Sequence, residues 1–214
     1  AYTVDGDEAG EISYENFNAA AAFVTVHGFS VHPGSAKNAM KNAQNIAIEF
    51  HNALPYYDRP EYTENREGFY HLCSMEGDVT GAKLGYIVRD HSAESFAARK
   101  ETMRHIAKLL NEKYGEGTVE LELKDSYFSM LEKIKPHFHL VENARAAIRK
   151  AGLEPLETPI RGGTDGARLS FMGLPCPNLF TGGMNFHGKF EYCSLTTMRK
   201  AQQVILNLAV LWSE

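Results

Sequence analysis

The sequence predicts an α/β protein in which a ferredoxin-like α+β domain is inserted into part of a three-layer α/β domain. Between residues 19 and 125, segments with strand-like alternation and segments with helical periodicity occur in the order strand–helix–strand–strand–helix–strand. After residue 125, helical stripes alternate with Gly-rich loops and one short apolar strand, which is typical of a three-layer domain. We therefore expect the segments 1–18 and 126–214 to form one domain around the inserted domain 19–125.

The first half of the insertion is expected to contain one strand, one helix and a long loop. Residues 19–28 are rich in β-forming side chains that alternate between two faces. A helix is expected from Ser35 to the residue before Pro55, because proline ends a helix. Its apolar stripe would comprise Met40, Ala43, Ala47, Phe50 and Leu54. The charged segment 56–68 is expected to be a loop.

The second half of the insertion is expected to contain two strands, a helix and a last strand. Segments 69–76 and 79–90 alternate as strands and are joined by Gly77-Asp78. The helix that follows would present the stripe Phe96, Met103, Ile106, Ala107 and Leu110. In the last strand, 119–125, apolar residues alternate with charged ones. Two helices on one face of this sheet would leave the other face open for a partner.

The segment after residue 125 supplies the remaining elements of the divided domain. We expect a helix with the stripe Leu140, Ala144, Ala147, Ile148 and Ala151, closed by Gly152. A Gly-rich loop at 161–166 precedes a short helix at 167–172, and 177–180 is a short buried strand. The last helix would begin after Ser194 as its N-cap, with the stripe Met198, Ala201, Ile205, Leu208, Ala209 and Trp212.

Composition excludes several classes of protein. The net charge is −5 and no Lys/Arg block occurs, so we expect no nucleic-acid partner. No segment approaches the ~18 consecutive apolar residues of a membrane span. The three cysteines form no CxxC pair, and so few cysteines favour a reducing compartment over a disulfide scaffold. The chain begins with Ala1, and the next residues, Tyr2, Thr3 and Val4, have the pattern of the end of a strand. We therefore expect the chain to be part of a longer protein.

Two segments carry candidate metal ligands. In Thr3-Val4-Asp5-Gly6, Asp5 follows a strand and would project into the crevice where open α/β sheets bind ligands. An ordinary Asp-Gly turn is the alternative. In the loop 181–188, His187 lies among glycines after a strand, where it could bind a metal or be a surface residue.

Three further residues could act on a substrate. Arg161 and the Gly-Gly-Thr-Asp-Gly segment after it precede a helix and could bind an anion. Thr164 or Asp165 could also cap that helix, and the two roles are compatible. The segment lacks the lysine and spacing of a phosphate-binding P-loop. His32, pinned before Pro33-Gly34, could donate to an oxyanion. Arg89 could clamp a carboxylate or make a surface ion pair.

Taken together, these segments resemble the peptidase T family of two-zinc aminopeptidases. The similar stretches run through the whole chain: TVDG at 3–6, ENFNAA at 15–20, VHPGSAKNAM at 31–40, EGFYHL at 67–72, RGGTDGARLSFMGLPCPNLFTGG at 161–183 and NFHGKFE at 185–191. The long stretch at 161–183 is the most specific of them, because related two-zinc peptidases share the Gly-Gly-Thr-Asp-Gly loop more loosely. The resemblance therefore favours peptidase T over other families of this clan.

This resemblance implies a cytoplasmic zinc enzyme that removes the N-terminal residue of tripeptides. It implies two zinc ions, with Asp5 and His187 as ligands, and a lid domain through which a homodimer forms. It implies that His32 is the lid histidine that reaches the reacting carbonyl of the substrate. It also implies that Arg89, Arg161 and Asn185 bind the substrate.

The family also requires a His-x-Asp motif, a bridging Asp and a Glu-Glu pair that includes the general base. None of these precedes Asp5 in this sequence. We therefore expect the chain to be inactive alone, because each zinc would keep one ligand. The alternatives are a non-catalytic dimerisation or binding module, and a related dipeptidase or acylase.

Overall fold

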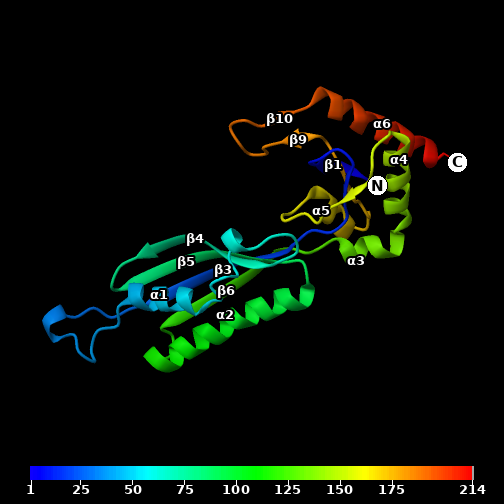
Figure 1. The fold of residues 1–214 in the computed structure, drawn as a ribbon. Coiled ribbons are helices and arrows are strands. Elements are labelled where there is room, and N and C mark those ends of the chain that lie inside the picture. Colours follow the sequence, from blue (N-terminus) through cyan, green and yellow to red (C-terminus); the bar gives the residue numbers. More distant parts are fainter. Residues whose placement is uncertain (214) are drawn as a thin grey trace. The chain divides into compact units, whose positions relative to one another are not determined.

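The computed structural model describes residues 1–213, which form two compact units. One unit comprises Ala1–Phe17 together with the segment from Tyr127 onward, and the other comprises Asn18–Ser126 (Figure 1). Each unit has its own cluster of buried apolar side chains. Within residues 1–213, no helix combines the length and the apolar character needed to cross a membrane.

The unit 18–126 contains the predicted order of elements. These are β3 (Asn18–His27), α1 (Ala43–Ala53), β4 (Phe69–Gly77), β5 (Gly81–Asp90), α2 (Ala93–Tyr114) and β6 (Val119–Tyr127), with short 3-10 turns at Pro33–Ser35 and Pro60–Tyr62. The strands hydrogen-bond in the order β4-β5-β3-β6, and β5 is antiparallel to both β3 and β4. This order places the first and third strands of the unit at the centre of the sheet, as in a ferredoxin-like fold.

Both helices cover the same face of this sheet (Figure 1). Alternate residues of β3, such as Val24 and Val26, are buried with Phe50 of α1 and Met103 of α2. The five residues of the predicted α2 stripe are all buried. The opposite face carries Phe23, which is 45% exposed. The apolar side chains that recur every second residue in the strands therefore pack against those that recur every 3.6 residues in the helices, and together they form one core.

The predicted start of the first helix is wrong by eight residues. The helix begins at Ala43, because the Asn42 side chain caps it by accepting hydrogen bonds from the amides of Gln44 and Asn45 at 3.0 and 3.3 Å. Lys41 cannot be helical, since its backbone pairs with that of Phe29. Met40 therefore lies outside the helix, whereas the rest of the predicted stripe is buried.

The other unit is built around a small mixed sheet. Its strands are β1 (Thr3–Gly6), β2 (Glu11–Ser13), β7 (Leu156–Glu157) and β8 (Asn178–Phe180), in the order β1-β8-β2-β7. Its helices are α3 (Leu131–Ile134, followed by a 3-10 turn at Lys135–His137), α4 (His139–Lys150), α5 (Asp165–Phe171) and α6 (Leu195–Leu211), and β9 (Gly183–Met184) pairs with β10 (Tyr192–Cys193). β1 lies at one edge of the sheet and runs parallel to β8.

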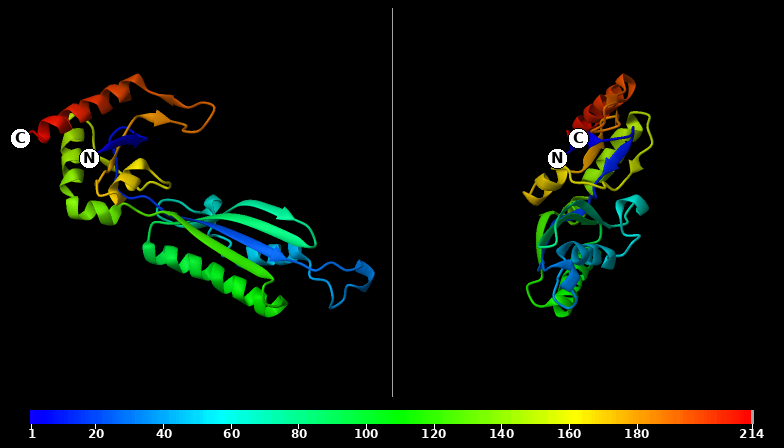
Figure 2. Two further views of the ribbon diagram at one scale, coloured as in Figure 1. Left: turned by 180° about the vertical axis from the view of Figure 1, so that it is seen from behind. Right: turned by 90° about the vertical axis from the view of Figure 1, so that its left-hand side faces the viewer.

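Helices α4 and α6 lie side by side and share the core of this unit (Figure 2). The predicted α6 stripe is partly wrong. Ala201 and Leu208 are buried, but Met198, Ile205 and Trp212 are 50%, 47% and 51% exposed, and Ala209 is exposed as well. Val204 and Asn207 are buried in addition to Ala201 and Leu208, so the face of α6 that packs on the unit includes these four residues. Ser194 is the N-cap residue of α6, but its side chain makes no capping hydrogen bond.

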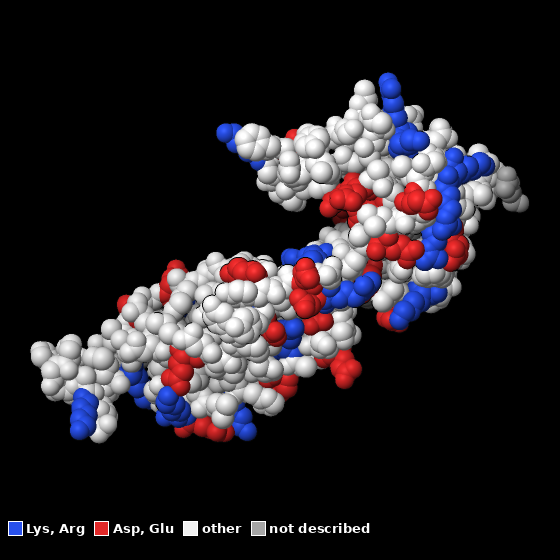
Figure 3. Space-filling view, viewed as in Figure 1, with Lys and Arg blue, Asp and Glu red and all other residues white. Residues whose placement is uncertain are grey.

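Charged side chains of both signs occur on the face drawn in Figure 3, and the run of Lys and Arg side chains on its right-hand side lies beside Asp and Glu side chains. This pattern agrees with the net charge of −5.

Candidate functional site

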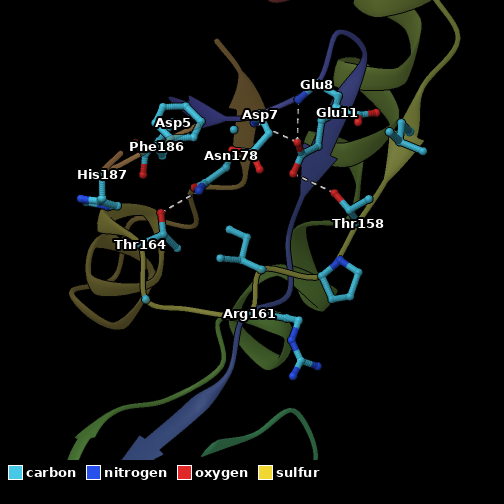
Figure 4. A pocket seen from close by; sticks show the side chains of 15 residues that line it. Asp5, Asp7, Glu8, Glu11, Thr158, Arg161, Thr164, Asn178, Phe186 and His187 are labelled. Atoms are coloured by element: carbon cyan, nitrogen blue, oxygen red, sulfur yellow. Dashed lines mark hydrogen bonds between the residues drawn. The ribbon is translucent and has the colours of Figure 1, made fainter. Parts of the chain in front are cut away.

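A pocket of about 560 Å³ opens in the unit that contains the small sheet. Segments far apart in the chain line it, and they include three of the predicted site residues: Asp5, Arg161 and His187 (Figure 4). Glu11, Thr158 and Asn178, which the sequence analysis did not single out, line it as well. The pocket lies at the carboxyl end of β1, which supplies Asp5 and Gly6, and the β8 residue that lines it is Asn178, the first of that strand.

Asp5 lies at an irregularity of strand β1. The pairing with β8 shifts between Val4, opposite Leu179, and Gly6, opposite Phe180, so that Asp5 is the extra residue of a β-bulge. A bulge redirects the side chain of the extra residue, and bulges often occur beside functional sites. The bulge therefore determines how Asp5 faces the pocket. Gly6 follows it without a side chain, and an added Cβ would lie 3.1 Å from the β8 backbone.

Thr181 connects the Asp5 strand to the loop that carries His187. Its amide and its hydroxyl both donate to the carbonyl oxygen of Gly6 at 2.8 Å, and the hydroxyl accepts from the amide of Gly183 at 2.9 Å. The amide of Gly182 donates to the Asp7 carbonyl at 3.0 Å. The two candidate metal ligands are thus held by one hydrogen-bonded junction.

The loop around His187 is conformationally demanding. Asn185 and His187 have φ values of 58° and 59°, a left-handed region that non-glycine residues seldom adopt. The Glu191 carboxylate accepts from the His187 amide at 2.8 Å, and the Asn185 carbonyl accepts from the Gly188 amide at 2.9 Å. Backbone strain of this kind persists only where surrounding contacts impose it, and it concentrates at functional sites.

The Gly-rich loop is tied to β8 by a capping residue. Thr164 is the N-cap of α5 and accepts from the Gly166 amide at 3.3 Å, while the Asn178 side chain donates to the Thr164 hydroxyl at 2.6 Å. A Cβ on Gly166 would lie 2.4 Å from the Asn178 side-chain oxygen. The capping role expected for Thr164 is confirmed, and α5 spans only seven residues.

Arg161 lines the pocket, but its guanidinium is engaged elsewhere. The guanidinium carbon lies 5.1 Å from the centre of the Phe17 ring, and in Figure 4 the group points away from Asp5 and His187. Its assignment to a substrate carboxylate stays a prediction.

The other three predicted residues do not line this pocket. The side-chain amide of Asn185 donates to the Phe190 carbonyl at 3.2 Å. His32 and Arg89 belong to the unit 18–126. The His32 Nδ1 atom accepts from the Gly34 amide at 3.1 Å, and the Arg89 guanidinium lies 5.9 Å from the centre of the Phe69 ring. Their roles likewise stay predictions.

The pocket is strongly acidic. Partial burial raises the pKa of Asp7, and the neighbouring carboxylates of Glu11, Glu8 and Asp5 raise it further. Such a concentration of negative charge suits a cation. The side chains present fit a zinc site in part: Asp5 and His187 are donors of the right kind, but within residues 1–213 no three His, Cys, Asp or Glu side chains converge as a metal site would need.

Comparison with known proteins agrees with the predicted resemblance. Residues 14–118 match the family model of the peptidase dimerisation domain. The whole chain is 56% identical to peptidase T of Caldanaerobacter subterraneus subsp. tengcongensis, of which it covers 52%. The chain thus spans about half the length of the curated relatives it matches.

Solved structures have the same fold. The aminopeptidase PepT of Bacillus cereus superposes on 97% of this chain with a TM-score of 0.84, at 21% identity and over 55% of its own length. A dinuclear metal binding peptidase of the M20 family from Bacillus subtilis superposes on 99% of the chain with a TM-score of 0.69, at 16% identity and over 55% of its own length. The resemblance to peptidase T is therefore confirmed along the entire chain, and residues 14–118 carry the peptidase dimerisation domain pattern.

Proposed function

We propose that this chain is about half of a metal-dependent tripeptide aminopeptidase of the peptidase T family that acts in the cytoplasm. The observation that carries the proposal is the meeting of Asp5 and His187 in one acidic pocket, in a chain similar to peptidase T from end to end. In the proposed assignment, the unit that contains this pocket is part of a three-layer catalytic domain. The unit 18–126 is the lid, through which two copies form a homodimer.

In the proposed site, Asp5 and His187 each hold one of two zinc ions. Two such ions, when bound, acidify a water molecule and polarise the scissile carbonyl. Asp5 offers a carboxylate oxygen at the bulge of β1, and His187 an imidazole nitrogen from a loop that the Glu191 contact keeps in place. The remaining ligands and the general base would come from a segment of the whole protein that corresponds to the part of its relatives outside this chain.

Substrate contacts are assigned to both units. His32 would donate a hydrogen bond to the developing oxyanion. Because its Nδ1 atom accepts from the Gly34 amide, Nε2 is the nitrogen left to carry that proton. Arg89, Arg161 and Asn185 would bind the substrate, the two arginines at its terminal carboxylate. Recognition of that carboxylate by the two arginines would limit the length of the substrate.

A non-catalytic dimerisation module is the second candidate. Within residues 1–213, no three potential metal-binding side chains converge into a coordination set, which a module without turnover would also show. A related dipeptidase or acylase is a third candidate, and a substrate panel would separate it from a tripeptidase.

The test measures zinc binding and tripeptide hydrolysis in the whole protein and in its Asp5→Ala and His187→Ala variants. If both residues are ligands, each variant should lose zinc affinity and at least about 100-fold of its activity. Mutating a residue that only orients a metal ligand already lowers metal affinity or activity by about 10- to 100-fold. Lys189→Ala, in the same loop as His187, is the matched control and should leave both quantities unchanged. Full activity in either ligand variant would contradict the proposal.

A further inference from the structure

We propose that Glu11 is a positioning residue, which locks the bulge of β1 and thereby holds Asp5 toward the pocket. The metal role of Asp5 belongs to the proposed function above and this inference rests on it, but the lock itself can be measured without any metal. Glu11 is absent from the set of residues predicted from the sequence. Its side chain lies in the middle of the pocket wall, between the strand that carries Asp5 and Thr158 (Figure 4).

The carboxylate of Glu11 accepts four hydrogen bonds. Oε2 accepts from the backbone amides of Asp7 and Glu8 at 2.8 and 3.1 Å. Oε1 accepts from the hydroxyls of Ser13 and Thr158, at 2.8 and 2.7 Å. Glu11 is 8% exposed. A buried carboxylate with donors on both oxygens is stabilised in one orientation, and it costs less to bury than an unpaired one.

The two amides that Glu11 binds come directly after the bulge. On the other side of the same segment, the carbonyls of Gly6 and Asp7 accept from the Thr181 and Gly182 amides. The segment 6–8 is therefore held from both sides: its carbonyls by the loop after β8, its amides by Glu11. Without Glu11, the Asp7 and Glu8 amides would lose the acceptor that fixes the exit from the bulge.

The geometry distinguishes a positional role for Glu11 from a purely electrostatic one. The amides of Asp7 and Glu8 can only donate, so they require an oxygen at the Oε2 position. The hydroxyls of Ser13 and Thr158 can donate or accept, so an amide group at the Oε1 position would also be satisfied. Glu11→Gln can therefore keep all four contacts while it removes the charge, whereas Glu11→Ala removes both.

The experiment compares amide hydrogen exchange at Asp7 and Glu8, followed by NMR without metal, in the wild type and three variants. Glu11→Ala should speed exchange at both positions by about tenfold, the equivalent of one lost hydrogen bond. Glu11→Gln should restore the wild-type rates. Glu8→Gln removes a carboxylate from the same pocket without removing any of the four hydrogen bonds to Glu11, so it is the matched control and should leave the rates unchanged. Thr158→Val removes one hydrogen bond to Glu11 but keeps its charge and both amide contacts. It should speed exchange at Asp7 and Glu8 by less than Glu11→Ala does. It tests the proposal if Glu11→Ala does not fold.

Zinc affinity measured on the same whole proteins then connects the lock to Asp5. The expected result is a loss of about 10- to 100-fold in Glu11→Ala with recovery in Glu11→Gln, the range for residues that orient a ligand. Unchanged exchange at Asp7 and Glu8 in both Glu11→Ala and Thr158→Val would overturn the proposal, as would a Gln variant that behaves like Ala. Altered exchange with unaltered zinc affinity in Glu11→Ala would keep the lock but remove Asp5 from the metal site, and so would count against the proposed function instead.

Discussion

At the scale of single residues, Glu157 illustrates how contacts set a pKa in this protein. Burial alone would raise the pKa of Glu157, but hydrogen bonds from the Tyr14 hydroxyl and the Arg145 guanidinium, both at 2.7 Å, outweigh it and hold the pKa below its ordinary value. Burial, together with the same hydrogen bond, raises the pKa of Tyr14 to about 12. Because the folded state favours the ionised Glu157, this carboxylate stabilises the protein above the ordinary glutamate pKa. That contribution is lost as the pH falls through the lowered one.

Arg145→Met should therefore raise the pKa of Glu157 and weaken the dependence of stability on acid pH. The Glu157 side chain is 33% exposed, so solvent screening limits the loss to about 0.5–1 kcal/mol at neutral pH. The pKa is measured by carbon-13 NMR titration of the carboxyl group, and the free energy of unfolding by urea denaturation at pH 7 and pH 3. Lys150→Met, at the end of the same helix, is the control. Equal losses at the two pH values would contradict the assignment.

The candidate site shows which residues a sequence can reveal. The local patterns at Asp5 and His187 left alternatives open, and the resemblance to peptidase T singled the two residues out; both line the pocket. Glu11 was missed, since one of its partners, Thr158, lies 147 positions away in the sequence. The bulge at Asp5 was missed for the same reason: it depends on Thr181, which lies 175 positions from Gly6. Local patterns contain no information about such distant contacts.

At the scale of elements, periodicity predicted where helices and strands occur better than where they begin. The α2 stripe is correct because the helix packs a full 3.6-residue face on the sheet. The start of α1 was wrong because the competing pair of Phe29 with Lys41 is a tertiary contact. Strands β2, β7, β9 and β10 are two or three residues long, and they were missed because alternation needs a longer run to be recognised.

The cap of α1 can be tested by Asn42→Ala. The side chain accepts from two amides of the first turn, so its removal should cost about 1 kcal/mol of the free energy of unfolding. Asn42→Asp retains an acceptor and should restore most of the stability. The free energy is measured by urea denaturation. Asn38→Ala is unsuitable as a control, because Asn38 has a φ of 61°. Asn52→Ala, at the other end of the helix, serves instead. An Asn42→Ala variant as stable as this control would show that the helix does not depend on the cap.

At the scale of the whole molecule, two separate cores support the two units. Leu84 is buried in the core of the unit 18–126, and Ile148 in the core of the other unit. The second unit also exposes large apolar side chains along α6, among them Leu206, which is 54% exposed. Apolar surface of this kind adds no stability while it faces water. The unit 18–126, whose helices both cover one sheet face, should therefore be the more self-sufficient of the two.

Limited proteolysis followed by mass spectrometry can test this difference. In the wild type, we expect the segment 127–213 to be cut before the unit 18–126. Leu84→Ala creates a cavity that should cost about 2–5 kcal/mol and speed cleavage within the unit 18–126 alone. Ile148→Ala, the matched variant in the other core, should speed cleavage within 127–213 alone. If each variant instead accelerated cleavage of both units equally, the two cores would unfold as one cooperative structure, because only then would a cavity in one lower the free energy that protects the other.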